Sequence, residues 1–142
     1  MNRGIPVGPT MPPTVRTALL LIAHGSREPQ ANDDLHRLAE QLRRQGRYPI
    51  VEPAYLELAE PDIDAGGARC VEQGAVRVIL VPYFLSAGVH VRRDLTDARD
   101  RLAARFPAVE FRLAEPLGRH PKLVEVVAER AAEAGGLSSE LQ

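Results

Sequence analysis

The chain has 142 residues, 44% of them hydrophobic, which suits a single domain with a packed core. Its 18 basic and 19 acidic side chains give a formal net charge of −1, which argues against general affinity for nucleic acid or an anionic membrane. The one cysteine, Cys70, excludes an internal disulfide and fits a reducing, cytoplasmic compartment. On a predicted helix, this lone thiol is expected to be a small core residue rather than a nucleophile.

The ends of the chain are expected to lie outside the folded domain. Residues 1–17 are rich in glycine and proline and lack the apolar core of a secretion signal, so they predict a flexible extension. The domain is expected over residues 18–134, and residues 135–142 predict a frayed tail. The longest apolar run near the start, residues 18–23, is far shorter than the roughly 20 residues of a membrane helix.

The first half of the domain alternates strand and helix. Residues 18–23, ALLLIA, are apolar throughout and predict a central strand. Residues 31–45 carry apolar side chains at helical spacing, and Gly46 is expected to end that helix. Residues 50–57 predict a second strand at an edge of the sheet, because Pro53 cannot donate to a ladder.

A second helix is expected to open near Glu60 and to end by Gln73, with Pro61 in its first turn. Gly66 and Gly67 lie inside it and lower its intrinsic stability by roughly 1 kcal/mol each. Close packing against a neighbouring element is a plausible reason for the two glycines.

The second half repeats the alternation. Residues 78–81, VILV, form a mostly β-branched run typical of a strand covered on both faces. A loop over residues 82–90 leads into a helix over residues 91–105. Residues 109–114 alternate apolar and polar, as in a half-exposed strand. The last helix is expected to start at Pro121. Its inward-facing residues are predicted to be Leu123, Val124, Val127, Ala128 and Ala131.

The order βαβαβαβα predicts a single α/β domain with a parallel four-stranded sheet and helices on both faces. We expect the flavodoxin-like strand order 2-1-3-4. This order places the first and third strands side by side where the winding reverses, and ligands bind at that edge.

Polar side chains with metal-binding or acid–base chemistry follow each predicted strand. His24 follows the first strand, Glu57 ends the second, and His90 and His120 follow the third and fourth, whereas His36 lies inside the first helix. Parallel strands share one carboxyl edge, so these four side chains are expected to gather on one rim. Neutral imidazole binds iron, cobalt, nickel and zinc, and it can also accept protons near neutral pH. A nearby carboxylate can orient the ring or complete the site.

Other chemistries have weaker support in the sequence. The chain contains neither a G-x-x-x-x-G-K-[ST] phosphate loop nor a G-x-G-x-x-G dinucleotide turn. Ser26 follows a His-Gly pair but stands in no G-x-S-x-G elbow, so it supports a hydrolase only weakly. A hydrolase that uses His24 covalently remains an alternative, although histidine phosphatases place arginine where this chain has Ala23.

Two further groups of side chains surround the predicted rim. Arginines form the first group, either as solvated surface charge or as a collar that pairs with carboxylates. They are Arg27, Arg92, Arg93 and Arg119. Apolar side chains form the second group and would suit a flat apolar ring. They are Tyr83, Phe84, Leu85 and Val89.

At these residues the chain resembles the sirohydrochlorin cobaltochelatase and ferrochelatase family, the short CbiX/SirB-like proteins. The matching segments are LLIAHGSREPQAN, AYLELAEPDI, ILVPYFLSAGVHVRRD and AEPLGRHPKL. They run in family order from about Leu19 to Leu123. HGSR and PYFLSAG-x-H together are specific to the family, whereas either segment alone is much less so.

The resemblance implies a class II chelatase fold and ATP-independent insertion of divalent cobalt, iron or nickel into sirohydrochlorin, on the way to sirohaem or cobalamin. It implies that His24 and His90 are the active-site histidines that bind the metal, with Glu57 as the catalytic glutamate. The metal is then a substrate, no cofactor is permanently bound, and two chains pair as a homodimer. We expect the tetrapyrrole to contact Ser26, Arg27, Tyr83, Leu85, Ser86, Ala87, Gly88, Arg92 and Arg93. A non-enzymatic metal or tetrapyrrole carrier that uses the same histidines is the leading alternative.

Overall fold

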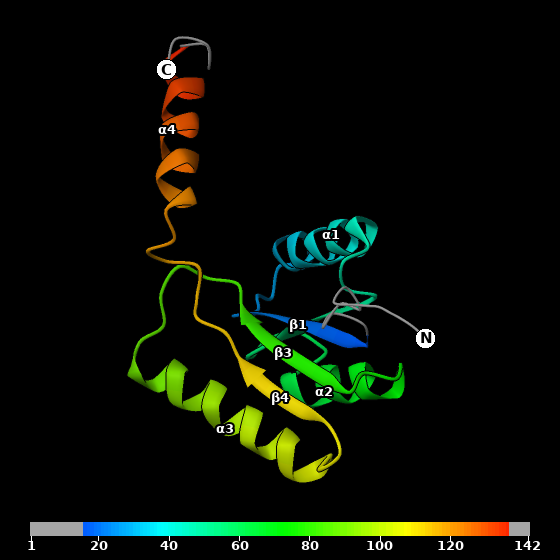
Figure 1. Cartoon of the computed structure of the whole chain (residues 1–142). Helices are drawn as coiled ribbons and strands as arrows, with labels where there is room; N and C mark the ends of the chain where they lie inside the picture. The colour runs from blue at the N-terminus through cyan, green and yellow to red at the C-terminus, as the bar shows by residue number, and fades with distance from the viewer. Residues whose placement is uncertain (1–15, 137–142) are drawn as a thin grey trace.

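The computed structural model describes residues 16–136, which form an α/β unit (Figure 1). Strands and helices alternate from end to end. They are β1 (Thr17–Ala23), α1 (Pro29–Gln45), β2 (Ile50–Tyr55), α2 (Ile63–Glu72), β3 (Arg77–Pro82), α3 (Val89–Arg105), β4 (Glu110–Leu113) and α4 (Lys122–Gly135). The four strands form one parallel sheet in the order β2-β1-β3-β4, so the predicted fold class and strand order are confirmed.

β1 lies at the centre of the sheet, as its apolar sequence predicts. It is buried along nearly its whole length and pairs with β2 on one side and β3 on the other. Ala23 lies opposite Tyr55 of β2, and Ile22 lies opposite Pro82 of β3, so the three strands end at one edge. β2 occupies an edge of the sheet, where a strand tolerates a proline such as Pro53, which has no amide proton to donate.

One face of the sheet packs against α2 and α3, below the sheet in Figure 1. Gly66 and Gly67 make this packing possible. A Cβ on Gly66 would lie 2.8 Å from Leu20 Cδ1, and one on Gly67 would lie 2.7 Å from a methyl carbon of Leu102. The close approach of helix to neighbour explains why both positions are glycine. Cys70 is fully buried in the same cluster and behaves as the core residue that the sequence predicts.

The opposite face is covered by α1, which lies over β1 and β2. Leu35 and Ala39 of α1 pack onto this face, and Tyr55 is buried between helix and sheet. The Tyr55 hydroxyl donates to the Asn32 carbonyl at 2.8 Å, and burial followed by the charge of Asp33 raises the pKa of Tyr55. This hydrogen bond ties the start of α1 to the end of β2.

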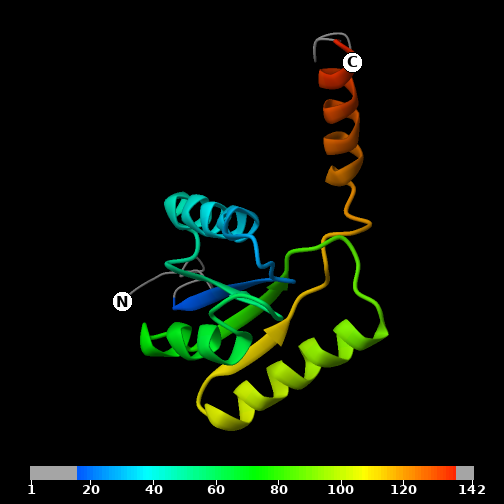
Figure 2. The same ribbon diagram turned by 180° about the vertical axis from the view of Figure 1, so that it is seen from behind.

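The prediction that α4 packs inward is wrong. α4 projects from the carboxyl edge and stands clear of the sheet, of α2 and of α3 (Figures 1 and 2). Val124 and Val127 are 73% and 67% exposed, and the other residues expected to face inward, Leu123, Ala128 and Ala131, are half-buried or exposed. Helices therefore lie on both faces of the sheet, but one face has only α1.

Several helix and strand ends differ from the predicted ones by a few residues. β2 ends at Tyr55, so Glu57 lies in the following loop. α2 begins at Ile63 because Asp62 caps it by accepting from the Ala65 amide at 2.8 Å, which leaves Pro61 ahead of the helix. Residues 1–15 of the predicted extension and 137–142 of the predicted tail lie outside the described residues, whereas Thr17 already belongs to β1 and Gly135 to α4. Among residues 16–136, no helix is both long and apolar enough to cross a membrane.

Candidate active site

The loops that follow β1, β2 and β3 are joined by backbone hydrogen bonds that extend the sheet beyond its strands. The Tyr83 amide donates to the Ile22 carbonyl at 2.6 Å, and the Glu57 amide donates to the His24 carbonyl at 3.0 Å. The exposed His24 side chain therefore lies at the carboxyl edge, with Glu57 on the adjacent loop. The sequence predicted that the residues at the strand ends lie close together, and the backbones of His24 and Glu57 do so.

Gly25 allows this arrangement. Its φ is +98°, a left-handed conformation that glycine adopts without strain. A Cβ at this position would lie 1.8 Å from the Glu57 carbonyl oxygen, closer than any contact that atoms tolerate. The glycine after His24 therefore lets the first two loops touch.

Asn32, which sequence analysis missed, holds the rest of the His24 loop. Its Oδ1 accepts from the Ser26 amide at 3.0 Å, and its Nδ2 donates to the Ser26 carbonyl at 2.8 Å. The Ser26 hydroxyl accepts from the Glu28 amide at 3.0 Å, so Ser26 stabilises the turn into α1. The sequence does contain a signal for this role, because Asn32 lies in the first turn of a helix that follows a polar loop, where its side chain can reach the loop backbone.

The His24 ring lies against an apolar surface. Its centroid is 4.6 Å from that of Phe84, with the two planes inclined by 33°. Tyr83 and Leu85, the sequence neighbours of Phe84, are 41% and 62% exposed, and Val89 at the start of α3 is 70% exposed. Large apolar side chains rarely cluster in solvent without a partner, so the predicted apolar lip is a candidate seat for a ligand.

His90 lies in the first turn of α3, a difference from its predicted place in the loop. The carbonyl of Gly88 accepts from the Arg92 amide at 2.9 Å, so the helix starts at Val89. His90 is exposed, and the structure shows no direct contact of its side chain with His24 or Glu57. Within residues 16–136, no three His, Cys, Asp or Glu side chains form a ready metal cage.

The His120 side chain accepts a backbone hydrogen bond, unlike His24 and His90. Its Nδ1 accepts from the Lys122 amide at 3.1 Å, at the first turn of α4. In the neutral ring this leaves the proton on Nε2, so neither nitrogen offers a free lone pair to a metal.

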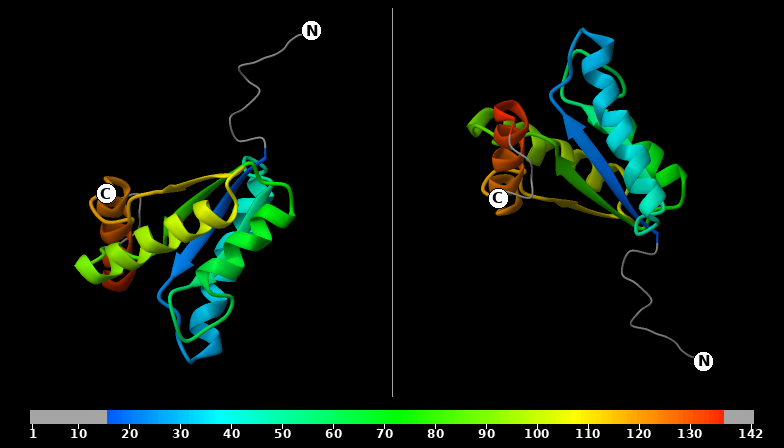
Figure 3. Two further views of the ribbon diagram at one scale, coloured as in Figure 1. Left: turned by 90° about the horizontal axis from the view of Figure 1, so that it is seen from below. Right: turned by 90° about the horizontal axis from the view of Figure 1, so that it is seen from above.

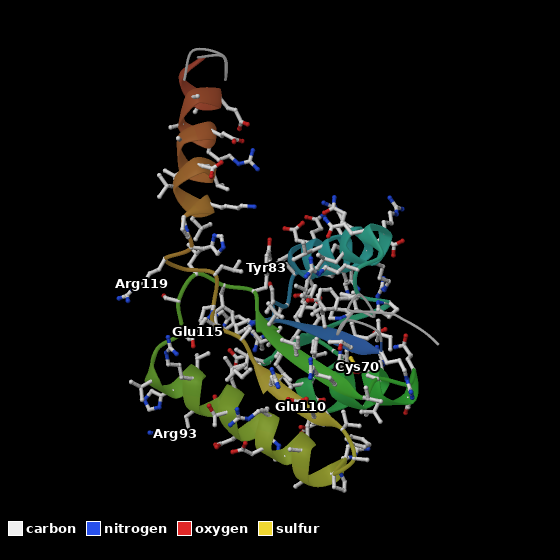
Figure 4. The ribbon with its side chains drawn as sticks, viewed as in Figure 1. Cys70, Tyr83, Arg93, Glu110, Glu115 and Arg119 are labelled. Carbon is white, nitrogen blue, oxygen red and sulfur yellow. The ribbon has the colours of Figure 1, made fainter. Side chains whose placement is uncertain are left out.

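The predicted arginine collar is only partly assembled. Arg92 donates to the Ala87 carbonyl at 3.2 Å and lies 3.7 Å from Glu115. Arg27 is exposed and is in no ion pair with a described residue. Arg93 extends from α3 on the side away from the sheet (Figure 4).

A hollow of about 570 Å³ lies between the loop after β3 and the loop after β4. It is lined by Leu85, Ser86, Ala87, Arg92, Glu115, Pro116, Gly118 and Arg119. Figure 4 shows Glu115 and Arg119 on the second of these loops. Two guanidinium groups and a serine hydroxyl suit a carboxylate, although Glu115 already shares Arg92.

The family model for CbiX matches residues 18–134, nearly all of the described chain. The chain belongs to the CbiX family. It is 38% identical over 112 residues to the chloroplastic sirohydrochlorin ferrochelatase of Arabidopsis thaliana, covering 79% of this chain and 50% of that protein. It is 36% identical over 130 residues to the sirohydrochlorin cobaltochelatase of Priestia megaterium, covering 92% and 42%.

A solved structure shows the same CbiX fold at similar length. The CbiX protein of cobalamin biosynthesis from Marinobacter aquaeolei VT8 superposes with a TM-score of 0.72 at 35% identity, covering 83% of this chain and 96% of that one. By contrast, this CbiX chain spans about half the length of the curated relatives it matches first.

Proposed function

We propose that this chain inserts a divalent metal, cobalt, ferrous iron or nickel, into sirohydrochlorin without ATP. The observation that carries the proposal is the exposed His24 imidazole, held against Phe84 beside an apolar lip, in a chain that belongs to the CbiX family. The names of the ferrochelatase and cobaltochelatase relatives support the reaction class and two of the three metals.

His24 and His90 would hold the incoming ion. Imidazole is a ligand for all three metals, and two protein ligands leave several positions open. The open positions suit this reaction because the macrocycle itself supplies four nitrogens to the ion. His24 follows β1 and His90 lies in the first turn of α3, and binding of the ion would bring both imidazoles to one face of a bound ring.

The ring would lie on the apolar lip with its acidic edge toward arginine. Tyr83, Leu85 and Val89 are exposed apolar side chains that would supply this surface. Arg27 and Arg92 carry charge that complements the substrate's carboxylates, and Arg119 adds to it from the opposite wall of the 570 Å³ hollow. Holding ring and ion together removes the entropic cost of their encounter.

The reaction also releases two pyrrole protons, which need an acceptor. Glu57 is exposed, and its backbone is bonded to that of His24, so its carboxylate is one candidate. The histidine imidazoles are the others. Replacing Glu57 by glutamine removes the base but keeps the shape, so metallation that falls by at least about tenfold would assign the role to Glu57.

We also propose that two chains pair as a homodimer. The curated relatives that match first are about twice as long, so one copy of this chain accounts for only half of their length. A second copy would supply the missing half.

The test is to mix the purified chain, well below the substrate concentration, with sirohydrochlorin and each metal in turn. The absorbance spectrum of the metallated ring should then grow over many turnovers and faster than without protein. A carrier would instead retain one metal or one ring per site and leave the rate unchanged, and that result would reject the chelatase proposal.

A further inference from the structure

The loop after β3 has a neighbouring loop on each side, because β3 itself lies between β1 and β4 (Figure 3). On one side, the Tyr83 amide donates to the Ile22 carbonyl at the end of β1. On the other side, the Leu117 amide in the loop after β4 donates to the Phe84 carbonyl at 3.0 Å. Residues 83 and 84 are therefore held from both sides, by the end of β1 and by the loop after β4.

Gly118 brings the loop after β4 into direct contact with the loop after β3. A Cβ on Gly118 would lie 2.0 Å from the carbonyl oxygen of Leu85 and 3.1 Å from its carbonyl carbon. The φ of Gly118 is outside the left-handed region, so the close approach to Leu85 is what requires glycine here. Leu117 and Gly118 thus form a clasp, the β4 clasp, on the backbone of Phe84 and Leu85.

Phe84 connects the β4 clasp to His24. Its neighbours Tyr83 and Leu85 are exposed, whereas Phe84 is half-buried and packs against the core cluster between the sheet, α2 and α3. The centroid of its ring is 4.6 Å from that of the His24 ring. Because its backbone is clasped and its side chain lies partly in the core, Phe84 gives the imidazole a rigid surface to pack against.

The imidazole of His24 has no other device to orient it. A histidine that binds a metal through one ring nitrogen usually donates the N–H of the other to a carboxylate or a carbonyl, and this hydrogen bond fixes the ring. Within residues 16–136, the His24 imidazole forms no hydrogen bond and no ion pair. Packing against the Phe84 ring is therefore the contact left to set its orientation.

We propose that Phe84 is a positioning residue that orients His24 for metal binding, and that the β4 clasp of Leu117 and Gly118 holds Phe84 in place. This inference rests on the proposed function, in which His24 is a metal ligand. It gives Phe84 a role different from that of its exposed neighbours, which remain available to the tetrapyrrole. It also gives the β4 clasp an effect on metal affinity that requires no contact with the metal.

The first test measures the affinity of the full chain for Co²⁺ alone, by calorimetry and without tetrapyrrole. Phe84→Leu keeps an apolar side chain on the core but removes the flat ring, and it should weaken Co²⁺ binding at least about tenfold. Phe84→Tyr keeps the ring and should bind Co²⁺ as tightly as the unchanged chain. In a His24→Ala chain, Phe84→Leu should have no further effect, because its action passes through the imidazole. Far-UV circular dichroism checks the fold of each variant.

Two results of this first test would overturn the inference. Unchanged Co²⁺ affinity in Phe84→Leu would show that the ring does not orient His24. An equal loss of affinity with and without His24 would show that Phe84 supports the fold in general instead. Because the measured quantity is metal affinity, an unchanged chain that binds Co²⁺ but does not metallate sirohydrochlorin would refute the proposed function alone.

The second test addresses the β4 clasp. Gly118→Ala places a Cβ against the Leu85 carbonyl and should weaken Co²⁺ binding at least about threefold. Gly135→Ala in the last turn of α4 is the matched control, since nothing lies within 4 Å of its added Cβ, and it should leave the affinity unchanged. The NMR signals of the His24 ring protons, which the Phe84 ring current shifts, should move in Gly118→Ala toward their positions in Phe84→Leu. Unmoved His24 signals, or a Co²⁺ affinity equal to that of the control, would overturn the role of the clasp.

Discussion

At the scale of single residues, the His-Gly pair after β1 is where sequence and structure agree best. The sequence predicts that His24 lies at a strand exit, because this residue directly follows the apolar run of residues 18–23. What the sequence does not show is why the next residue is glycine. Gly25 adopts φ +98° and lets the Glu57 carbonyl approach, and both facts depend on a contact between segments 32 residues apart.

Replacing Gly25 by alanine is therefore expected to damage both stability and the site. The added Cβ meets backbone 1.8 Å away, so the free energy of unfolding should fall by at least about 3 kcal/mol. Gly46→Ala is the matched control, since Gly46 also has positive φ (+79°) but nothing within 4 Å of an added Cβ, and it should cost about 1 kcal/mol. Urea unfolding measures both. Equal losses would show that the loop contact is not what requires glycine.

Cys70 predicts a pH effect on stability. Burial, and then the nearby charge of Glu52, raises the pKa of its thiol from 9.0 to about 12. In the unfolded chain the thiol ionises first, so its contribution is complete below pH 9 and is lost as the pH rises toward 12. The free energy of unfolding should fall between pH 9 and pH 11 with a slope that Cys70→Ala makes less steep by up to about 1.4 kcal/mol per pH unit. Parallel slopes for the two proteins would contradict this.

At the scale of helices and strands, the expected strand order is present. The parallel sheet followed from the alternation of strands and helices, and the edge position of β2 followed from Pro53. The start of α3 did not, because Gly88 is extended and its carbonyl already accepts the first helical hydrogen bond, which draws His90 into the helix. The inward stripe of α4 was wrong for a different reason. Apolar spacing predicts that a helix side will be covered, but it does not say what covers it.

The junction between β1 and α1 offers a test at this scale. Asn32→Ala removes both hydrogen bonds to Ser26 and should cost about 2 kcal/mol of stability, because the groups are partly buried. Asn32→Asp keeps the Oδ1 acceptor and should cost less. Thermal unfolding measures stability, and the metallation rate reports whether His24 has lost its position. An unchanged midpoint in Asn32→Ala would rule out a structural role for this side chain.

At the scale of the whole molecule, the proposed chemistry depends on bringing distant strand exits to one edge. The sequence predicts this convergence, since parallel strands end together, and the backbone bonds among the first three loops confirm it for His24 and Glu57. The arginine collar was harder to predict, because spacing along α3 does not reveal which side of the helix faces the site. Arg92 faces the hollow, whereas Arg93 does not.

The central claim is that His24 and His90 carry out metal insertion, and single alanine substitutions test it most directly. His24→Ala and His90→Ala should each lower the rate of sirohydrochlorin metallation at least about 100-fold, with unchanged circular dichroism. His36→Ala, on the exposed surface of α1, should retain the full rate. Full metallation by either of the first two variants would contradict the claim.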